Sequence, residues 1–260
     1  MGNRLAGKTA MVIGGSSGIG RAVAQGFAQQ GATVAVADLH EEPREGGSPT
    51  AALIAEQGGA ASFVACDLMD EDRTARAFAQ ALEFLGSLDI MFVSAGTVEP
   101  CGDTRTVSLE HFDRHMRLNV RGTFLAVQHA LRAMVPQRNG SIITVASNFG
   151  QVGVAEMATY CASKAAVIGM VRSVAVEVGK HNVRVNALCP GATKTQINVG
   201  YRADDATQRL WQQETPLRMA DGEYVAETTD MAAAATYMAS DESRFMTGSC
   251  LTVDGGWIAH

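Results

Sequence analysis

Short apolar runs alternate with helical patterns along almost the whole chain of 260 residues. The runs that predict buried strands are 9–13, 33–37, 62–65, 90–94, 141–145, 183–188 and 250–253. Strands that alternate with helices form parallel βαβ units, so this pattern predicts an α/β fold with a doubly wound parallel sheet. Because no internal repeat or linker interrupts the pattern, we interpret residues 1–260 as a single domain.

The segments between these runs predict helices at 21–30, 51–57, 70–85, 109–134, 158–178 and 229–238. Asp70 is the expected cap of the third helix, and the fourth is expected to bend near Gly122. The polar segment 193–221 departs from the alternation and contains several short helical patterns. Segments that follow strand carboxyl ends in such sheets lie over the ligand crevice, so 193–221 is the expected substrate lid.

Composition and charge exclude several kinds of partner and site. A net charge of -6 without a basic stripe argues against nucleic acid and acidic membrane surfaces. No apolar run approaches the roughly 18 residues needed to span a membrane, and residues 1–7 lack the pattern of a signal peptide. The five cysteines are scattered without a C-x-x-C pair, which indicates reduced thiols and a cytoplasmic location. The six histidines lack ligand spacing, so we expect no metal site.

A glycine-rich turn lies between the first predicted strand and helix. Glycines there permit a tight turn and a close approach of the backbone to a pyrophosphate, which the helix amino terminus favours electrostatically. An ordinary strand-to-helix turn is the alternative. The residues expected to contact a dinucleotide in this turn are Gly14, Ser16, Ser17, Gly18, Ile19 and Gly20.

Asp38 ends the second predicted strand, eighteen residues after Gly20. A carboxylate at this place accepts hydrogen bonds from an adenosine ribose and repels a 2′-phosphate, so we predict NAD over NADP. The alternative is a simple loop cap, and Arg21 and Arg44 could soften the preference. Asp67, which follows the third strand, is expected to contact the adenine together with its neighbour Leu68, or else to cap its own loop.

A tyrosine and a lysine, Tyr160 and Lys164, lie one helical turn apart, and Ser147 follows the fifth predicted strand. Positions i and i+4 share a helix face. A neighbouring ammonium favours the phenolate form of a phenol, whose ordinary pKa is about 10. These groups suit removal of a proton from an alcohol while hydride leaves its carbon. By itself the pair also occurs by chance on helix surfaces.

Together these segments resemble the short-chain dehydrogenase/reductase family over essentially the whole chain. The matching stretches are 14–20, 66–68, 95–96, 118–120, 146–147, 160–164, 185–191 and 253–256. The resemblance implies a Rossmann-type sheet of about seven strands with helices on both faces, a nicotinamide dinucleotide and a homotetramer. Two departures, Ile13 in place of threonine and Val93-Ser94 in place of Asn-Asn, put the hydrogen bonds at these strand ends in doubt.

The resemblance also implies a role for each matching residue. Tyr160 would be the general base, and Lys164 would activate it and bond the nicotinamide ribose. Ser147 would stabilise the reacting oxygen. Asn119 would hold a water that links Lys164 to solvent, with a purely structural hydrogen bond as the alternative. Pro190, Gly191, Thr193 and Thr195 would surround the nicotinamide, and Ala95 and Gly96 are further residues expected to contact the cofactor.

A polar set of side chains is the expected lining of the substrate site: Glu99, Asn148, Gln151, Glu156, Lys194, Gln196, Asn198 and Arg202. A polar lining favours a sugar or polyol, and 190–198 is similar to the lid start of bacterial sugar 1-dehydrogenases. An acidic substituent held by Lys194 and Arg202 is a further idea, with a solvated surface as its alternative. The rival functions are a 3-oxoacyl thioester reductase, which Asp38 disfavours, and a non-catalytic dinucleotide-binding scaffold.

Overall fold

The computed structural model describes residues 3–219 and 222–259, and for Tyr201 and Arg202 the backbone alone. Within these residues seven parallel strands form one sheet in the order β3-β2-β1-β4-β5-β6-β7. Their bounds are β1 (Thr9–Ile13), β2 (Thr33–Asp38), β3 (Ala61–Ala65), β4 (Ile90–Val93), β5 (Gly140–Val145), β6 (Val183–Pro190) and β7 (Cys250–Val253). The order reverses between β1 and β4, which confirms the predicted doubly wound sheet and places its switch point there.

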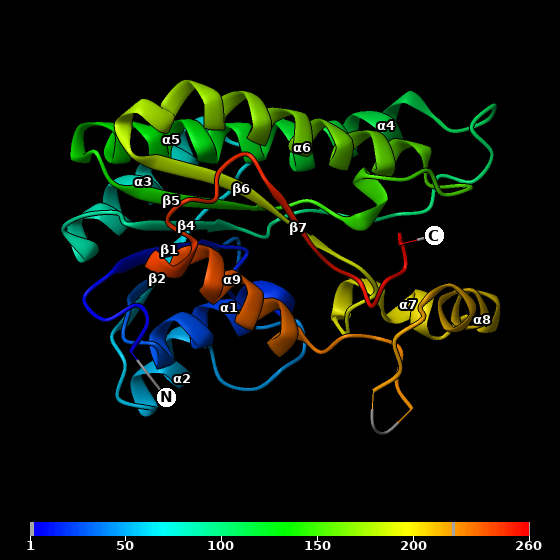
Figure 1. The fold of residues 1–260 in the computed structure, drawn as a ribbon, viewed down its shortest axis with the longest axis horizontal. Coiled ribbons are helices and arrows are strands. Elements are labelled where there is room, and N and C mark those ends of the chain that lie inside the picture. The colour runs from blue at the N-terminus through cyan, green and yellow to red at the C-terminus, as the bar shows by residue number, and fades with distance from the viewer. Residues whose placement is uncertain (1–2, 220–221, 260) are drawn as a thin grey trace.

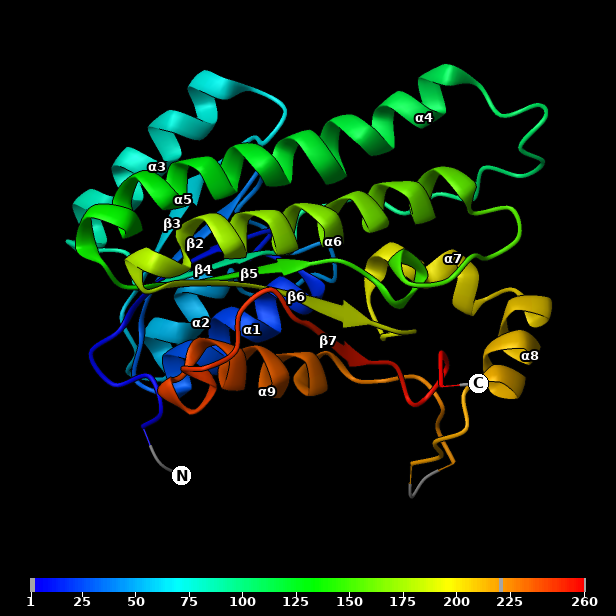
Figure 2. The same cartoon turned by 45° about the horizontal axis from the view of Figure 1, so that its top comes forward.

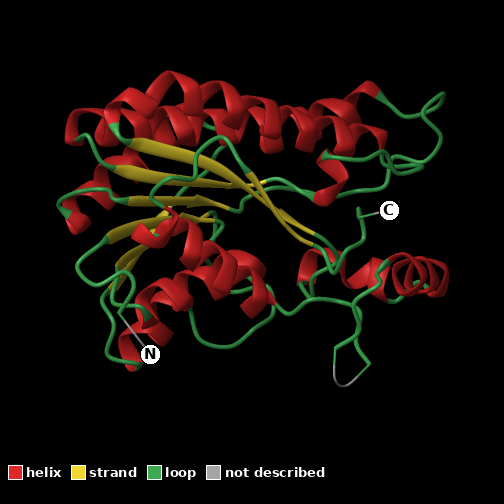
Figure 3. Cartoon of the chain, in the orientation of Figure 1, coloured by secondary structure: helices red, strands yellow, loops and turns green. Residues whose placement is uncertain are grey.

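Helices cover both faces of the sheet (Figure 1). One face carries α3 (Glu71–Leu85), α5 (Thr123–Gln137) and α6 (Ala158–Val178), and the other carries α1 (Gly18–Gln29), α2 (Thr50–Glu56) and α9 (Thr228–Ala239). Figure 3 shows the red helices on either side of the yellow strands. Each face has its own buried apolar cluster, because fully buried parallel strands present hydrophobic side chains to both sides.

The fourth predicted helix is divided by a wider segment. It consists of α4 (Leu109–His115), a π-helix over Met116–Gly122 and then α5, and Figure 2 shows α4 running on into α5. Where the sequence predicted a bend near Gly122, the structure has a π-helical stretch that ends at this glycine. A Cβ at Gly122 would lie 3.0 Å from the Cβ of Leu68, so glycine lets the helix approach the loop after β3.

The predicted lid contains three short helical pieces: a 3-10 turn over Gln196–Asn198, α7 (Val199–Arg202) and α8 (Asp205–Glu214). Asp204 caps α8, because its carboxylate accepts a hydrogen bond from Thr207 N at 2.7 Å. The segment projects beyond the carboxyl end of the sheet (Figure 1). The predicted lid also includes residues 220 and 221, which lie outside the described residues.

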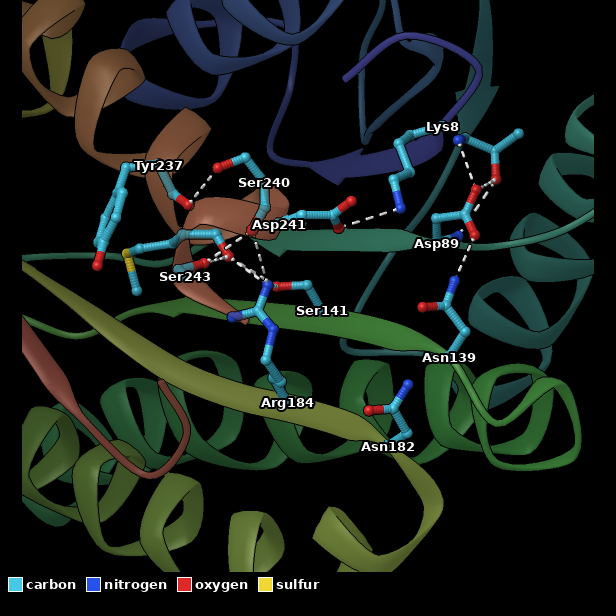
Figure 4. Close-up of polar contacts among 12 residues, drawn as sticks. Lys8, Asp89, Asn139, Ser141, Asn182, Arg184, Tyr237, Ser240, Asp241 and Ser243 are labelled. Atoms are coloured by element: carbon cyan, nitrogen blue, oxygen red, sulfur yellow. Dashed lines mark hydrogen bonds and ion pairs between the residues drawn. The ribbon is translucent and has the colours of Figure 1, made fainter. Parts of the chain in front are cut away.

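Polar side chains brace the amino-terminal end of the sheet (Figure 4). The guanidinium of Arg184 on β6 donates to Ser141 Oγ at 3.0 Å and to Met238 O at 2.7 Å. Met238 lies in the last turn of α9, so this cation meets the negative end of the helix dipole. Asp89 accepts from Thr9 N at 2.9 Å in the same region. These contacts hold the end of the sheet opposite the functional crevice.

Among the helices that the structure describes, none combines the length and apolar character needed to cross a lipid bilayer.

Candidate active site

A cavity of about 770 Å³ opens at the carboxyl ends of the strands, around the switch point between β1 and β4. Its nucleotide half is formed by the turns after β1, β2 and β3, at residues 14–19, 38–44 and 66–69. Its substrate half is formed by three groups of residues: Val98 and Pro100; Phe149 and 154–157; and 196–198, Thr207, Leu210 and Trp211. Ligands of doubly wound sheets bind in this crevice, so the two halves are one candidate site.

Tyr160 and Lys164 meet where the two halves join. Lys164 Nζ lies 5.7 Å from the centre of the Tyr160 ring, so the two side chains share a face of α6 as their spacing predicts. The ammonium donates a hydrogen bond to Val145 O at 2.9 Å. Burial lowers the pKa of Lys164 to about 8. The Lys164 amine therefore lies beside the Tyr160 phenol, and burial destabilises its charged form.

Ser147 leads out of β5 and caps a 3-10 turn over Asn148–Gly150. Its hydroxyl accepts from Phe149 N at 3.1 Å and donates to Asn148 Oδ1 at 3.2 Å. The residue is 6% exposed and lines the cavity together with Tyr160. A ligand oxygen that reaches the phenol can thus also meet this hydroxyl.

Asn119 lies in the π-helix, behind the cavity wall and not in it. Its Nδ2 donates to Thr97 O at 2.9 Å and Ser163 Oγ at 3.1 Å, and its Oδ1 accepts from Thr97 N at 2.8 Å. The side chain therefore makes the structural hydrogen bonds that were its alternative role. It braces the chain just after Ser94, where the family pattern is altered, and Ser94 N itself donates to Ile13 O at 2.8 Å.

The glycine-rich turn depends on the absence of side chains at two points. A Cβ at Gly14, whose φ is 80°, would lie 2.6 Å from Ala95 N. A Cβ at Gly20 would lie 1.9 Å from Gly14 O. Gly20 does not line the cavity, contrary to our expectation of a cofactor contact. It lets the first turn of α1 pack under Gly14.

Two carboxylates face the glycine-rich turn. Asp38 accepts from Ser16 N at 3.0 Å and from Leu39 N at 2.7 Å, so it also fulfils its alternative role as a loop cap. Glu45, which the sequence did not single out, accepts from Gly18 N at 3.0 Å. The hydroxyl of Ser16 is buried and has no hydrogen-bond partner among the described residues. Close backbone, a spare hydroxyl and an acidic group at the end of β2 fit the ribose-pyrophosphate part of a dinucleotide.

The two arginines that could accept a 2′-phosphate are placed differently. Arg21 turns to the loop before α2, where it donates to Ser48 O at 2.8 Å and Thr50 Oγ1 at 3.1 Å. Its Nε lies 3.9 Å from a Glu45 carboxylate oxygen. Arg44 lines the cavity. Of the two, Arg44 alone therefore faces the crevice.

The remaining cofactor residues line the cavity as expected: Ser17, Ile19, Asp67, Leu68, Ala95, Gly96, Pro190, Gly191, Thr193 and Thr195. Asp67 also caps its loop, since it accepts from Met69 N at 3.0 Å and from Arg73 Nη1 at 2.8 Å. A Cβ at Gly191 would lie 2.7 Å from Asp254 Cα, so the chain after β6 passes close to the turn after β7.

The structure does not bring the predicted polar substrate residues together. Gln151 donates to Thr252 Oγ1 at 2.9 Å and lies outside the cavity lining. Lys194 pairs with Glu227 at 2.7 Å and lines a separate polar depression of about 530 Å³ between α1 and α9. Glu99 pairs with Arg114 at 2.9 Å. These side chains form ion pairs or hydrogen bonds with other residues instead of facing a substrate. The spacing of residues along the chain does not reveal such partners.

Three further members of that set differ in their placement. The side chain of Arg202 lies outside the described residues. Asn148 and Asn198 do line the cavity. The Asn198 amide, however, donates to Thr193 O at 2.6 Å, where it caps its own 3-10 turn with Thr195. Its hydrogen-bonding capacity is therefore largely spent within the lid.

Apolar side chains make most of the substrate half: Val98, Pro100, Phe149, Val154, Met157, Ile197, Leu210 and Trp211. They come from three segments that are distant in the sequence, the last of which includes α8, so no local pattern joins them. The available signals were Ile197 and the apolar pair Leu210 and Trp211 within the lid sequence. Glu156, Gln196, Asn198 and Thr207 are the polar side chains that the lid and the loop before α6 add to this half.

A buried histidine, His115, packs edge-on against the Tyr160 ring. The His115 ring lies 5.9 Å from the Tyr160 ring, and its Nδ1 is 3.2 Å from Thr159 Oγ1. Burial lowers the pKa of His115, which favours the neutral ring. Within residues 3–219 and 222–259, no three His, Cys, Asp or Glu side chains are grouped as a metal site.

Comparisons with known proteins agree with this architecture. A family model described as enoyl-(acyl carrier protein) reductase matches residues 13–258. A 2,5-dichloro-2,5-cyclohexadiene-1,4-diol dehydrogenase of Sphingobium indicum is 39% identical over 98% of this chain and 98% of its own. (+)-Borneol dehydrogenase 2 of Salvia officinalis is 37% identical over 98% of this chain and 91% of its own.

A solved structure shows the same fold over its full length. A putative NAD(P)-dependent gluconate 5-dehydrogenase from Beutenbergia cavernae, with NADP bound at low occupancy, has a TM-score of 0.89 and 33% identity, covering 100% of both chains. The sheet order, the glycine-rich turn and the paired Tyr160 and Lys164 thus occur in a chain whose relatives act on hydroxyl groups. The chain belongs to the short-chain dehydrogenase/reductase family, a group of oxidoreductases that bind a nicotinamide dinucleotide.

Proposed function

We propose that this protein is an NAD-dependent dehydrogenase that interconverts a secondary hydroxyl on a largely apolar ring and the corresponding ketone. The observation that carries the proposal is the position of Tyr160, Lys164 and Ser147 between a polar nucleotide half and an apolar substrate half. A hydroxyl placed between the phenol and the serine would have its carbon directed toward the nucleotide half. The small-molecule substrate would then be oriented mainly by shape.

In alcohol oxidation, Tyr160 would take the hydroxyl proton as general base. A bound nicotinamide dinucleotide supplies the hydride acceptor. The Lys164 ammonium, 5.7 Å from the ring, would stabilise the phenolate and bond the nicotinamide ribose. The Ser147 hydroxyl would hold the substrate oxygen, and a water near Asn119 would return the proton to solvent.

Replacement of Tyr160 tests this mechanism. Tyr160→Phe keeps the ring that packs on His115 and Phe149 but removes the proton acceptor. We expect kcat to fall by about 10³-fold, a magnitude typical of general base loss, while the Kd of NADH measured by fluorescence stays within threefold. A variant with normal turnover would contradict the mechanism, and a cellular function untouched by it would favour the non-catalytic scaffold.

NAD preference is supported by the two carboxylates at the glycine-rich turn. A 2′-phosphate near Asp38 would meet a negative charge, and Glu45 already partners Arg21 at 3.9 Å. The related gluconate 5-dehydrogenase structure carries NADP, so the choice must be measured on this chain. Titration with NADH and NADPH gives it directly, and tighter binding of NADPH would overturn the preference.

The apolar lining distinguishes this proposal from the sugar or polyol dehydrogenase that a polar lining favoured. Two relatives carry names that specify ring alcohols, a cyclohexadiene diol and borneol. A sugar remains the second candidate, because Asn148 and Gln196 line the cavity and one solved neighbour is named for gluconate. A panel of cyclohexanol, glucose, gluconate and a 3-oxoacyl thioester separates these classes, and activity on the last alone would favour the reductase.

We further infer from the family resemblance that the protein is a homotetramer, and from its cysteines that it is cytoplasmic. Five free cysteines accord with a reducing compartment. Light scattering of the purified protein tests the assembly, and a monomer at micromolar concentration would refute it.

A further inference from the structure

Glu156 has an unusual backbone conformation at the cavity wall. Its φ is 62°, a region that glycine tolerates and other residues adopt at a cost. The other described non-glycine residues with positive φ, Arg138 and Asn182, end helical segments, where this conformation is common. Glu156 instead lies in the loop just before α6, and strain of this kind concentrates at functional sites.

The surrounding loops hold Glu156 in this position. Its carbonyl accepts hydrogen bonds from Cys101 N at 2.9 Å and from Cys101 Sγ at 3.1 Å. These bonds join the loop after β4 to the loop before α6, and residues of both loops line the same cavity as Tyr160. Val154 and Met157 on either side also line the cavity. The Glu156 backbone is therefore held by two hydrogen bonds from Cys101.

The Glu156 carboxylate differs chemically from its surroundings. Glu156 is exposed and lines the substrate half together with Val154, Met157 and Trp211. The other cavity-lining acids, Asp38, Glu42 and Asp67, belong to the nucleotide half. No hydrogen bond or ion pair joins this carboxylate to another described side chain. An ionised carboxylate only accepts hydrogen bonds, so the partner that suits it is a donor.

We propose that Glu156 is a specificity-determining residue that accepts a hydrogen bond from a second hydroxyl of a cyclic diol, while the first hydroxyl reacts at Tyr160. This inference rests on the proposed function and narrows its substrate class. The apolar walls hold the ring, and the carboxylate distinguishes a diol from a simple alcohol. A carboxylate on the substrate would be repelled at the same point.

The test compares cyclohexanol with the cis and trans isomers of cyclohexane-1,2-, 1,3- and 1,4-diol, using NAD and wild-type, Glu156→Gln and Glu156→Gly enzymes. We expect at least one diol to exceed cyclohexanol in kcat/KM by about tenfold, the size of one hydrogen bond to a charged group. Glu156→Gln should remove this excess mainly through KM and leave cyclohexanol within twofold. Glu156→Gly should do the same and raise the Tm, since glycine relieves the positive φ.

Glu177→Gln on the outer face of α6 is the matched control, because it removes one exposed surface carboxylate and should change neither ratio. If cyclohexanol is oxidised but no diol is preferred, or the preference survives in Glu156→Gln, the inference is overturned. Preference for 4-aminocyclohexanol over every diol would also overturn it, by assigning a cation to the site. If no ring alcohol of any kind is oxidised, the proposed function fails instead.

Discussion

The two halves of the cavity are built in different ways. The nucleotide half consists of short turns that follow β1, β2 and β3. Its key contacts use the backbone N–H groups of Gly14, Ser16 and Gly18, which donate to Ala37 O and to the carboxylates of Asp38 and Glu45. The substrate half consists of side chains from loops and from α8, with Phe149 and Trp211 far apart in the chain. A site built from backbone geometry tolerates few residue types at each position. In a site built from side chains, substitutions in any contributing loop change the shape and polarity of the lining.

The halves also bind by different physical means. Backbone amides and a helix amino terminus suit the charged part of a dinucleotide. Apolar walls contribute through area removed from water, roughly 25 cal/mol per Å², so burial of about 100 Å² of a ring gains about 2.5 kcal/mol. Substitutions should therefore affect one half without the other, except at Tyr160 and Lys164, where the halves meet.

The largest effect on this comparison should come from Gly20→Ala. The new Cβ would lie 1.9 Å from Gly14 O, so the turn must move. We expect NADH affinity, measured by fluorescence titration, to fall more than about 100-fold, with a lower Tm, because an overpacked site costs about 1–3 kcal/mol or more.

Gly169→Ala is the control for this prediction. Gly169 lies within α6 with open space around its Cβ position, so alanine should leave NADH binding unchanged and raise helix stability slightly. If Gly20→Ala and Gly169→Ala lowered NADH affinity equally, the loss would not be specific to the glycine-rich turn.

At the junction, the buried Lys164 should make stability depend on pH. Its pKa is about 8 in the folded protein, below the ordinary value of 10.5. The unfolded chain therefore holds this proton between pH 8 and 10.5 while the folded chain does not, so the stability relative to Lys164→Met should rise across that window. The expected gain is about 3 kcal/mol. Chemical denaturation of both proteins at pH 7, 8, 9 and 10.5 measures it, and a flat difference would mean that the ammonium is well solvated.

In the nucleotide half, Asp38→Ser should weaken the discrimination against NADPH by about tenfold, because one carboxylate near the ribose is removed. The ratio of Kd values for NADPH and NADH is the measurement. Glu83→Gln, on the exposed side of α3, should leave that ratio unchanged. An unchanged ratio in Asp38→Ser would leave Glu45 as the carboxylate that governs cofactor choice.

In the substrate half, Trp211→Ala should lower kcat/KM for cyclohexanol about fivefold to tenfold through lost apolar contact. NADH affinity should stay within twofold, since Trp211 belongs to the lid side of the cavity. Gln213→Ala, on the exposed side of the same helix, should have no effect. A loss of NADH affinity in Trp211→Ala would show that the two halves are not independent.

Sequence reasoning succeeded where the signal is local. The strand alternation predicted the sheet, and the spacing of Tyr160 and Lys164 predicted their shared face. It was wrong where a residue had a nearer partner than the cavity. Gln151 bonds Thr252, and Lys194 pairs with Glu227, because tertiary contacts bring those partners within reach. Gly20 was correctly placed in the glycine-rich turn, but it packs beneath Gly14 and does not line the cavity as a cofactor contact would.

The sequence by itself determined the parallel sheet, the glycine-rich turn at its switch point and the Tyr160–Lys164 pair, because periodicity, glycine and helical spacing act over a few residues. Only the tertiary structure decided what lines the substrate half. There the loop after β4, the loop before α6 and the lid converge on one cavity, and they place Glu156 in a strained conformation among apolar walls. These loops meet because the parallel sheet places the carboxyl ends of distant strands side by side at one edge. No single stretch of the chain encodes that arrangement.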